Sequence, residues 1–157
     1  MKIKRMFVAV LVIILTGTFG FVYGKDAVLE KSTAKAAAKS MVIKAEEFVK
    51  VNGKEKAIEE FNKPEGQFVK GSFYVFVFDL KGTVIAHPLT PSLVGKNMIN
   101  EVDSQGKLFR KEIIEKAKSK GEGWVTYKYV NPTTKKETTK TSYFKKVGDM
   151  IIGCGAY

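Results

Sequence analysis

The chain has 157 residues, a length typical of one domain, and carries 27 Lys+Arg against 16 Asp+Glu for a formal net charge of +11. The lone cysteine, Cys154, excludes an internal disulfide bond and Cys-based zinc or haem-attachment motifs. Beyond residue 24 the only arginine is Arg110. Because phosphate clamping and base reading favour arginine, we expect no nucleic-acid binding and a solvated, lysine-rich surface.

Residues 1–24 have the pattern of a secretory signal peptide. A basic start and the apolar run "MFVAVLVIIL" precede Val22 and Gly24, which stand at the −3 and −1 positions of a cleavage site. The alternative is a retained N-terminal anchor, since the apolar stretch of about 18 residues approaches the ~20 that a membrane-spanning helix needs. We therefore expect one domain over residues 25–157, either periplasmic or secreted, or anchored to the inner membrane.

The domain begins with a long predicted helix over Lys25–Val51, rich in Ala, Lys and Glu. Asn52-Gly53 is a typical helix stop, and a short second helix is predicted over Glu55–Asn62. The apolar positions of the long helix recur at helical spacing. They are Ala34, Ala38, Met41, Ala45 and Phe48.

After Pro64 the period of the pattern changes to two. "SFYVFVFDL" (72–80) predicts a strand that is apolar on both faces, as expected in the middle of a sheet covered on both sides. "DLKGT" predicts a turn in which Asp79 bonds its own backbone and Gly82 takes a positive φ. "VIAHP" then forms the second strand of a hairpin, and it ends at His87, the only histidine.

The second half of the chain alternates once more between helix and strands. An irregular connector spans 93–106, in which Asp103 is a candidate cap for the following helix, predicted over Lys107–Gly121. Three strands follow, over 123–131, 137–147 and 150–157. This order predicts an α+β fold: a five-stranded antiparallel sheet with the long N-terminal helix on one face and loops plus a shorter helix on the other.

Several motifs, in order, resemble the single Cache domains, the extracytoplasmic PAS-like sensors of bacterial chemoreceptors and sensor kinases. They are "YVFVFDLKGTVIAHP", the Gly-Lys-Asn linker with an Asp-x-x-Gly turn in "LVGKNMINEVDSQGKLF", the Gly-Trp-x-x-Tyr strand, and the final strand "MIIGCGAY". The resemblance covers about residues 27 to 157. Cys154 stands where the family usually has serine, which is a change from one small residue to another.

Similar Cache sensors bind small organic molecules, often short carboxylates, between the sheet and its covering loops. The resemblance implies that lysine, imidazole and tyrosine hydroxyls hold such an anion within an aromatic lining, in keeping with the need to replace its lost water. No metal or other cofactor and no catalytic residue is expected. The matching ligand-binding positions are Tyr74, Phe76, His87, Tyr127, Lys140 and Tyr143.

Several of these positions have a second interpretation. Lys140 and Tyr143 are three residues apart and face opposite sides of a regular strand, so only a bulge would bring both to one pocket. Lys140 is otherwise a surface lysine, and the aromatic residues are otherwise ordinary core. His87 is either a ligand donor or a core histidine bonded to a backbone carbonyl, and a metal role lacks companion ligands.

The resemblance favours a non-enzymatic sensor that binds a small organic ligand, with an anion favoured, and it leaves a homodimer through the N-terminal helix open. No second membrane helix, kinase or methyl-accepting region follows the domain, so we expect signalling through a separate membrane receptor or kinase. One alternative is a partner-binding or structural domain with a degenerate pocket. A small hydrolase is a third hypothesis, for which the sequence shows no paired carboxylates and no nucleophile with an evident base.

Overall fold

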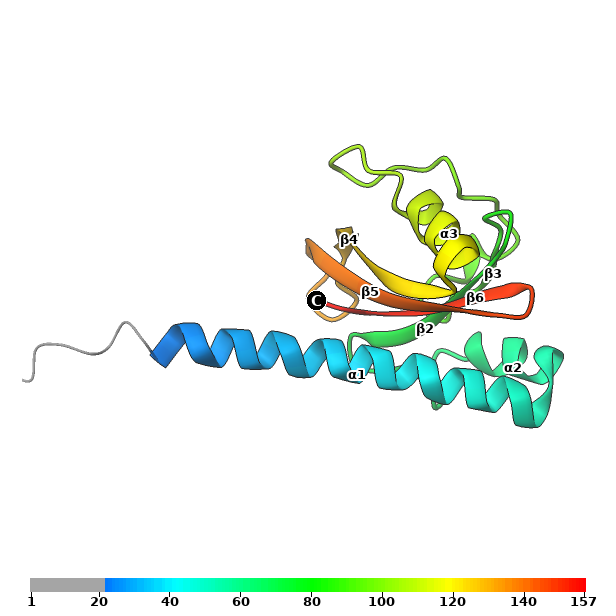
Figure 1. Cartoon of the computed structure of the whole chain (residues 1–157), viewed down its shortest axis with the longest axis horizontal. Coiled ribbons are helices and arrows are strands. Elements are labelled where there is room, and N and C mark those ends of the chain that lie inside the picture. The colour runs from blue at the N-terminus through cyan, green and yellow to red at the C-terminus, as the bar shows by residue number, and fades with distance from the viewer. Residues whose placement is uncertain (1–21) are drawn as a thin grey trace, which may run out of the picture.

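One antiparallel sheet separates two helices on one face from a third helix and long loops on the other (Figure 1). The computed structural model describes residues 22–157. The predicted leader or anchor over 1–24 therefore lies outside the described residues, apart from Val22–Gly24, which belong to the first turn of α1 (Val22–Asn52). Among the described helices, none has both the length and the apolarity required to cross a membrane.

Helix α1 lies along one face of the sheet and continues past its edge (Figure 1). Its buried residues Ala38, Val42 and Ala45 lie at helical spacing and face the sheet. The sequence pattern predicted Ala38 and Ala45 on this face but missed Val42, while the predicted Ala34, Met41 and Phe48 pack there partly buried. The helix ends where Gly53, at φ 82°, donates its N–H to the Val49 carbonyl. Helix α2 (Lys54–Phe61) then folds back beside α1 and completes the layer.

The sheet contains six strands rather than the five expected. They are β1 (Val69–Lys70), β2 (Phe73–Asp79), β3 (Val84–Ala86), β4 (Glu122–Val130), β5 (Glu137–Val147) and β6 (Met150–Ala156). The additional strand, β1, is only two residues long and pairs with the start of β2. The order is β1-β2-β6-β5-β4, with β3 also paired to β2, so the C-terminal strand occupies the centre of the sheet.

Strand β2 contributes to both cores because its side chains alternate between the two faces. Val75 and Val77 pack with α1 and α2, whereas Tyr74, Phe76 and Phe78 pack beneath helix α3 (Phe109–Lys120). Cys154 lies in the first core as a packed residue, as predicted, with its Sγ 3.6 Å from Met41 Sδ. Burial raises the pKa of its thiol to about 11.

The turn after β2 forms as the sequence predicts. Asp79 Oδ1 accepts hydrogen bonds from the N–H groups of Lys81 and Thr83, and Gly82 has a φ of 97°. A side chain at Gly82 would also collide with Ile99, because an added Cβ would lie 2.6 Å from the Ile99 Cβ. The hairpin therefore packs closely against the connector that follows it.

The prediction that Asp103 caps the next helix is wrong. Helix α3 begins at Phe109, with Leu108 in the N-cap position. The Asp103 carboxylate instead accepts hydrogen bonds from the backbone N–H groups of Gln105, Lys107 and Lys128. It therefore fastens the connector to strand β4, and the multiple N–H donors lower the pKa of this carboxyl group.

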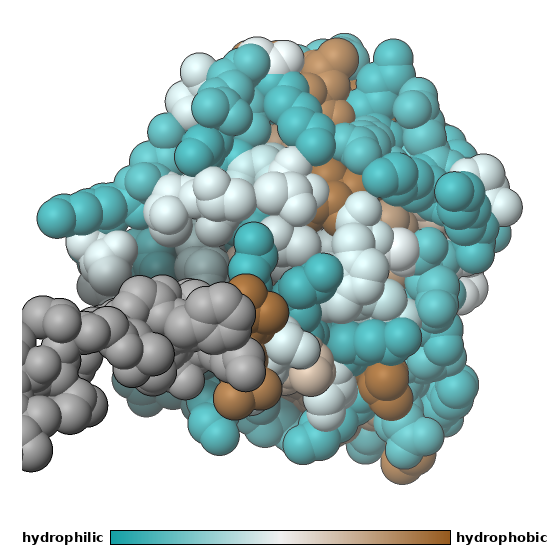
Figure 2. All heavy atoms as spheres, turned by 60° about the vertical axis from the view of Figure 1, so that its left-hand side comes forward, coloured by the Kyte–Doolittle hydropathy of each residue, from teal (hydrophilic) through white to brown (hydrophobic). Residues whose placement is uncertain are grey.

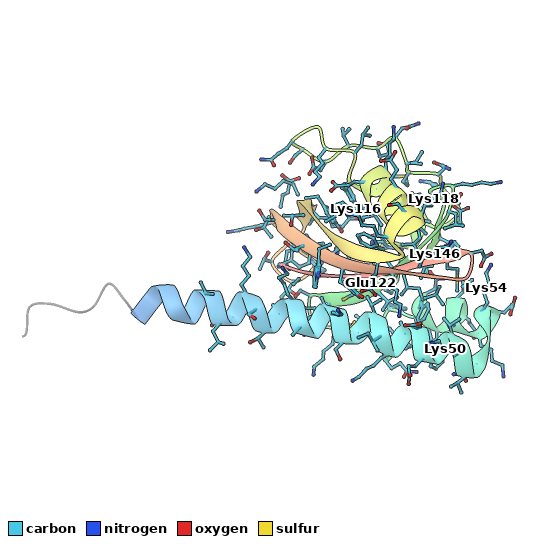
Figure 3. The ribbon with its side chains drawn as sticks, viewed as in Figure 1. Lys50, Lys54, Lys116, Lys118, Glu122 and Lys146 are labelled. Carbon is cyan, nitrogen blue, oxygen red and sulfur yellow. The ribbon has the colours of Figure 1, made fainter. Side chains whose placement is uncertain are left out.

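Most of the excess positive charge is in contact with solvent. Lys50, Lys118 and Lys146 are exposed on the helices and strands (Figure 3). Figure 2 shows one face of the molecule, on which hydrophilic residues predominate and hydrophobic ones form small, scattered patches. Among residues 28–157, for which the structure describes side-chain exposure, two cationic residues depart from this pattern: Arg110 and Lys140 are buried.

Candidate binding pocket

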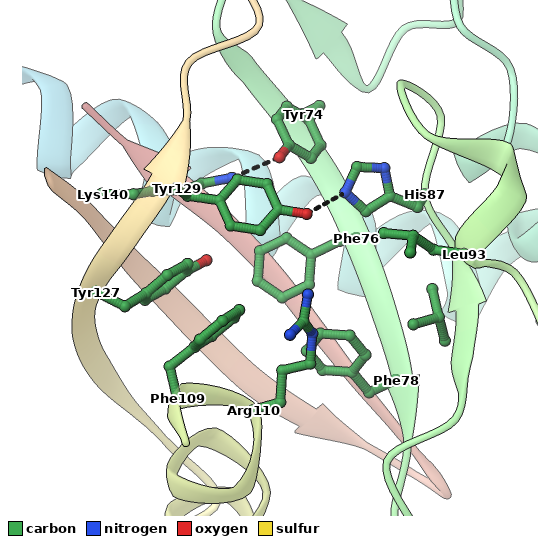
Figure 4. A pocket seen from close by; sticks show the side chains of 11 residues that line it. Tyr74, Phe76, Phe78, His87, Leu93, Phe109, Arg110, Tyr127, Tyr129 and Lys140 are labelled. Carbon is green, nitrogen blue, oxygen red and sulfur yellow. Dashed lines mark hydrogen bonds between the residues drawn. The ribbon is translucent and has the colours of Figure 1, made fainter. Parts of the chain in front are cut away.

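A small, partly open pocket lies between the inner face of the sheet and helix α3 with its preceding loop (Figure 4). Its side chains leave a cavity of about 10 Å³, which is room for roughly one water molecule. Strand β2, the end of the β2–β3 hairpin, α3 and strands β4 and β5 all contribute side chains to it. The lining residues are Tyr74, Phe76, Phe78, Val84, His87, Leu93, Phe109, Arg110, Tyr127, Tyr129 and Lys140.

Five of the six residues expected in the ligand site line this one pocket. They come from three strands and a hairpin end: Tyr74, Phe76, His87, Tyr127 and Lys140. Tyr143 lies on the opposite face of the sheet, in the core beneath α1, where its hydroxyl donates a 2.7 Å hydrogen bond to Glu122. Strand β5 keeps an unbroken register with both neighbours, so no bulge brings Lys140 and Tyr143 to the same side.

Lys140 is a buried lysine rather than a surface one. Only 1% of its surface is exposed, and its Nζ donates a 2.8 Å hydrogen bond to the Tyr74 hydroxyl. Burial, together with the charge of Arg110, lowers the pKa of the Lys140 amine to about 7. Four aromatic rings surround the amine, with Nζ-to-centroid distances of 4.0 Å for Tyr74, 5.0 Å for Tyr129 and Tyr157, and 5.5 Å for Phe76.

Two glycines of β6 make room for this arrangement. Gly155 lies under the Lys140 side chain, and a Cβ at this position would come within 2.1 Å of Lys140 Cε and 2.5 Å of Ser142 Oγ. Gly153 lies under the Phe76 ring, where a Cβ would approach to 2.3 Å. The floor of the pocket therefore requires residues without side chains at both positions.

Arg110 is the second buried cation of the pocket. It is 6% exposed, and its guanidinium carbon lies 4.3 Å from the centroid of the Phe109 ring (Figure 4). Among the described residues, neither Arg110 nor Lys140 forms a salt bridge with a carboxylate. Sequence reasoning singled out Arg110 for its rarity but did not place it in the site, although Arg110, Ile113, Ile114 and Ala117 share one helical face.

His87 enters the pocket from the end of β3. Its Nε2 lies 3.5 Å from the Tyr129 hydroxyl oxygen, and its buried Nδ1 has no hydrogen-bond partner among the described residues. Burial and the neighbouring Lys140 lower the pKa of the imidazole to about 3, so the ring is neutral. Asn62 fixes the backbone here, since its Oδ1 accepts a hydrogen bond from the His87 N–H and its Nδ2 donates to the Ile85 carbonyl.

On the side of the pocket opposite β2, two contacts hold the Tyr127 side chain in place. The Tyr127 ring stacks on Phe109 at a centroid distance of 3.9 Å, and its hydroxyl lies 2.8 Å from Ser142 Oγ. Tyr129, two residues further along β4, points to the same face and was not among the expected site residues. The period of two in β4 was the signal that could have added it.

The pocket adjoins a wider hollow at the surface. Residues of the connector and the β4–β5 turn line the outer space. Six side chains contribute to both spaces: Tyr74, His87, Leu93, Phe109, Arg110 and Tyr129. These six side chains therefore lie between the inner pocket and solvent. A ligand reaching Lys140 from this side would have to pass them.

The chemistry of the pocket suits a small anion. Two cationic side chains, tyrosine hydroxyls and an unpaired imidazole nitrogen converge within aromatic walls. Over residues 22–157, no group of three or more His, Cys, Asp or Glu is arranged to hold a metal ion.

Known structures show the same fold. A methyl-accepting chemotaxis protein from Vibrio parahaemolyticus RIMD 2210633 superposes with a TM-score of 0.71 at 24% identity, covering 85% of this chain and 95% of that one. A periplasmic sensor domain of a chemotaxis protein gives 0.62 at 21%, covering 87% and 98%. A Cache chemosensory domain, solved to explain carboxylic acid recognition, gives 0.60 at 23%, covering 90% and 99%.

A family profile described as "Cache domain" (dCache_2) matches residues 30–157. The match spans both helical layers and the whole sheet, including every residue that lines the pocket. The α+β, PAS-like architecture predicted from the motifs is confirmed. The chain belongs to the Cache domain family.

Proposed function

We propose that this chain is a non-enzymatic, extracytoplasmic sensor module that binds a short organic acid in the pocket between the sheet and α3. Cache domains are periplasmic sensor domains that act as ligand-binding signalling modules. One observation carries the choice of ligand: Arg110 and Lys140 are buried in one pocket, and within the described residues no carboxylate pairs with either.

A ligand carboxylate would relieve the cost of burying these cations. Removing a charged group from water costs several kcal/mol unless an opposite charge and hydrogen bonds compensate. The guanidinium of Arg110 offers two parallel donors to a carboxylate, and the Tyr129 hydroxyl and His87 imidazole lie beside it. The cavity of about 10 Å³ is smaller than any organic acid, so the lining side chains would have to move apart on binding, which favours a ligand of only a few carbon atoms. Carboxylic acid recognition by a Cache chemosensory domain of similar fold supports the same ligand class.

Binding would signal by favouring one of two conformations. A ligand shifts such an equilibrium only by its difference in affinity for the two states. The pocket strand β5 also reaches α1, through the 2.6 Å ion pair between Lys145 and Glu46. We propose that α1 moves against the sheet and passes the signal to a membrane receptor or kinase, or across a homodimer formed through α1.

A thermal-shift screen tests the ligand class. Short monocarboxylates such as acetate, propionate and pyruvate should raise the Tm in a concentration-dependent way, whereas methylamine, ethanolamine and neutral amides should not. Lys111, the exposed neighbour of Arg110 in α3, supplies a control of equal charge: Lys111→Met should keep the shift and Arg110→Met should lose it. If no organic acid raises the Tm, the pocket is degenerate and the domain serves only to bind a partner.

A further inference from the structure

The amine of Lys140 lies in surroundings that suit a covalent bond as well as an ion pair. It is 1% exposed, its one hydrogen bond among the described residues goes to a tyrosine hydroxyl, and a second cation lines the same pocket. A lysine that is desolvated near another cation and free of a carboxylate partner is the kind that attacks carbonyl groups. Solvated lysines on the surface lack this combination of features.

We propose that Lys140 forms a reversible imine with a short 2-oxo acid bound in the pocket. This inference rests on the proposed function, because the same pocket must first hold the carboxylate. In this arrangement Arg110 binds the ligand carboxylate at the mouth of the pocket, and the adjacent carbonyl carbon faces the Lys140 Nζ. An acid without the oxo group would bind through ionic contacts alone.

Imine formation requires only the Lys140 amine and the 2-oxo acid, and it releases one molecule of water. The Lys140 nitrogen lone pair attacks the carbonyl carbon, and a proton passes from nitrogen to the carbonyl oxygen to give a carbinolamine. The C–O bond then breaks, the hydroxyl leaves as water with the second nitrogen proton, and a C=N bond forms. Tyr74, whose hydroxyl lies 2.8 Å from Nζ, is placed to relay the proton from nitrogen to oxygen.

The pocket also favours the product. Protonation of the imine gives a cationic iminium, which would occupy the place of the ammonium among the rings of Tyr74, Phe76, Tyr129 and Tyr157. Its charge and that of Arg110 would lie close to the ligand carboxylate. The apolar lining disfavours the water that would hydrolyse the bond.

Enough of the neutral amine is present for the reaction at neutral pH. Desolvation lowers the pKa of Lys140 to about 7, and the nearby Arg110 acts in the same direction. The other titratable groups close to the amine are the His87 imidazole, the Cys154 thiol and the hydroxyls of Tyr74, Tyr129 and Tyr157. All are neutral at this pH, because burial lowers the pKa of the imidazole and raises the pKa of the thiol and the phenols. An exposed lysine, with a pKa near 10.4, would be almost entirely protonated.

Reductive trapping tests the imine. The full-length protein is incubated with pyruvate and sodium cyanoborohydride, and its intact mass and peptide map are recorded. We expect one reduced pyruvate adduct per chain, located on Lys140, and none with propionate or lactate. Lys140→Arg keeps the charge but cannot form an imine, so it should lose the adduct. Lys39→Arg, which changes an exposed lysine 5.0 Å from the Tyr143 ring, should retain it.

The outcomes separate this inference from the function on which it rests. If pyruvate raises the Tm but no adduct maps to Lys140, the imine is wrong and anion binding stands. If pyruvate, acetate and propionate all fail to raise the Tm and no adduct forms, both proposals fail. Adducts spread over exposed lysines, equal in the unmodified protein and Lys140→Arg, would also overturn the imine. The peptide map of the unmodified protein decides the question even if Lys140→Arg does not fold.

Discussion

The Lys140 Nζ on β5 donates a 2.8 Å hydrogen bond to the Tyr74 hydroxyl on β2, reaching across the central strand β6 at Gly155. The hydrogen bond therefore links β5 to β2 and passes over β6, which lies between them in the sheet. The contact forms because Gly155 offers no side chain where the lysine stem passes. A ligand that engages Lys140 would act on all three strands at once.

Gly155→Ala should abolish ligand binding. The new Cβ would lie 2.1 Å from Lys140 Cε and 2.5 Å from Ser142 Oγ, so the lysine must leave its position. We expect overpacking to lower the free energy of unfolding by roughly 1–3 kcal/mol. Urea denaturation and calorimetric titration with propionate measure the two effects.

The adjacent residue supplies the control for this prediction. Cys154 faces the opposite core beneath α1, so Cys154→Ser should leave propionate affinity nearly unchanged while lowering stability modestly. Full propionate binding by Gly155→Ala would show that Lys140 does not hold the ligand.

Lys140→Met should stabilise the free protein at pH 7 and below. The folded-state pKa of about 7 lies below the unfolded value of 10.5, so between these limits the unfolded chain binds more protons. Stability of the unmodified protein should therefore rise with pH from about 7.5 to 9.5, by up to roughly 1.4 kcal/mol per pH unit. Urea denaturation across this range should show the slope, and Lys140→Met should remove it. A slope that survives in the variant would mean that another group titrates.

His87 should dominate the loss of stability between pH 6.5 and 4.5. The pKa of the His87 imidazole is about 3 in the folded protein and 6.5 in the unfolded chain. Between these values the imidazole is protonated in the unfolded chain but neutral in the folded protein, so stability falls as the pH falls. Because this is the only histidine, the expected slope is that of a single proton, up to about 1.4 kcal/mol per pH unit. His87→Phe, which suits the aromatic lining, should flatten the curve in this window. An unchanged curve would show that the imidazole is solvated.

Tyr143→Phe should lower stability without affecting ligand binding. The variant loses the 2.7 Å hydrogen bond to Glu122 in the core beneath α1, a loss of about 1 kcal/mol. Tyr129→Phe removes a hydroxyl that lines the pocket, and it should weaken propionate binding instead. Parallel urea denaturation and calorimetric titration of both variants check the pair. If Tyr143→Phe instead weakened binding and Tyr129→Phe did not, Tyr143 would belong to the ligand site, as the sequence predicted.

Much of the fold follows from local patterns in the sequence. The period of two in 72–80 predicted the two-faced strand β2, and Asn52-Gly53 marked the end of α1 correctly. The spacing of Lys140 and Tyr143 predicted opposite faces, as observed in the unbroken register of β5. Strand β1 escaped prediction because two residues carry no periodic signal, and its pairing depends on β2.

The polar part of the pocket was harder to predict. Arg110 lies on the buried face of α3 with Ile113, but charged side chains are so seldom buried that the pattern favours a solvated arginine. Only the tertiary structure shows that α3 brings Arg110 into the same pocket as Lys140. Asp103 was misassigned for a similar reason, since its third hydrogen bond comes from Lys128 in a strand distant in sequence.

Calorimetric titration of propionate into the unmodified protein, Arg110→Met and Lys111→Met tests the central claim most directly. Removing a buried charge partner should cost at least 2 kcal/mol, so we expect Arg110→Met to bind roughly 30-fold more weakly or worse. Lys111→Met removes the same charge from the exposed side of α3 and should bind within about twofold of the unmodified protein. Equal affinity for all three proteins would contradict anion binding at Arg110.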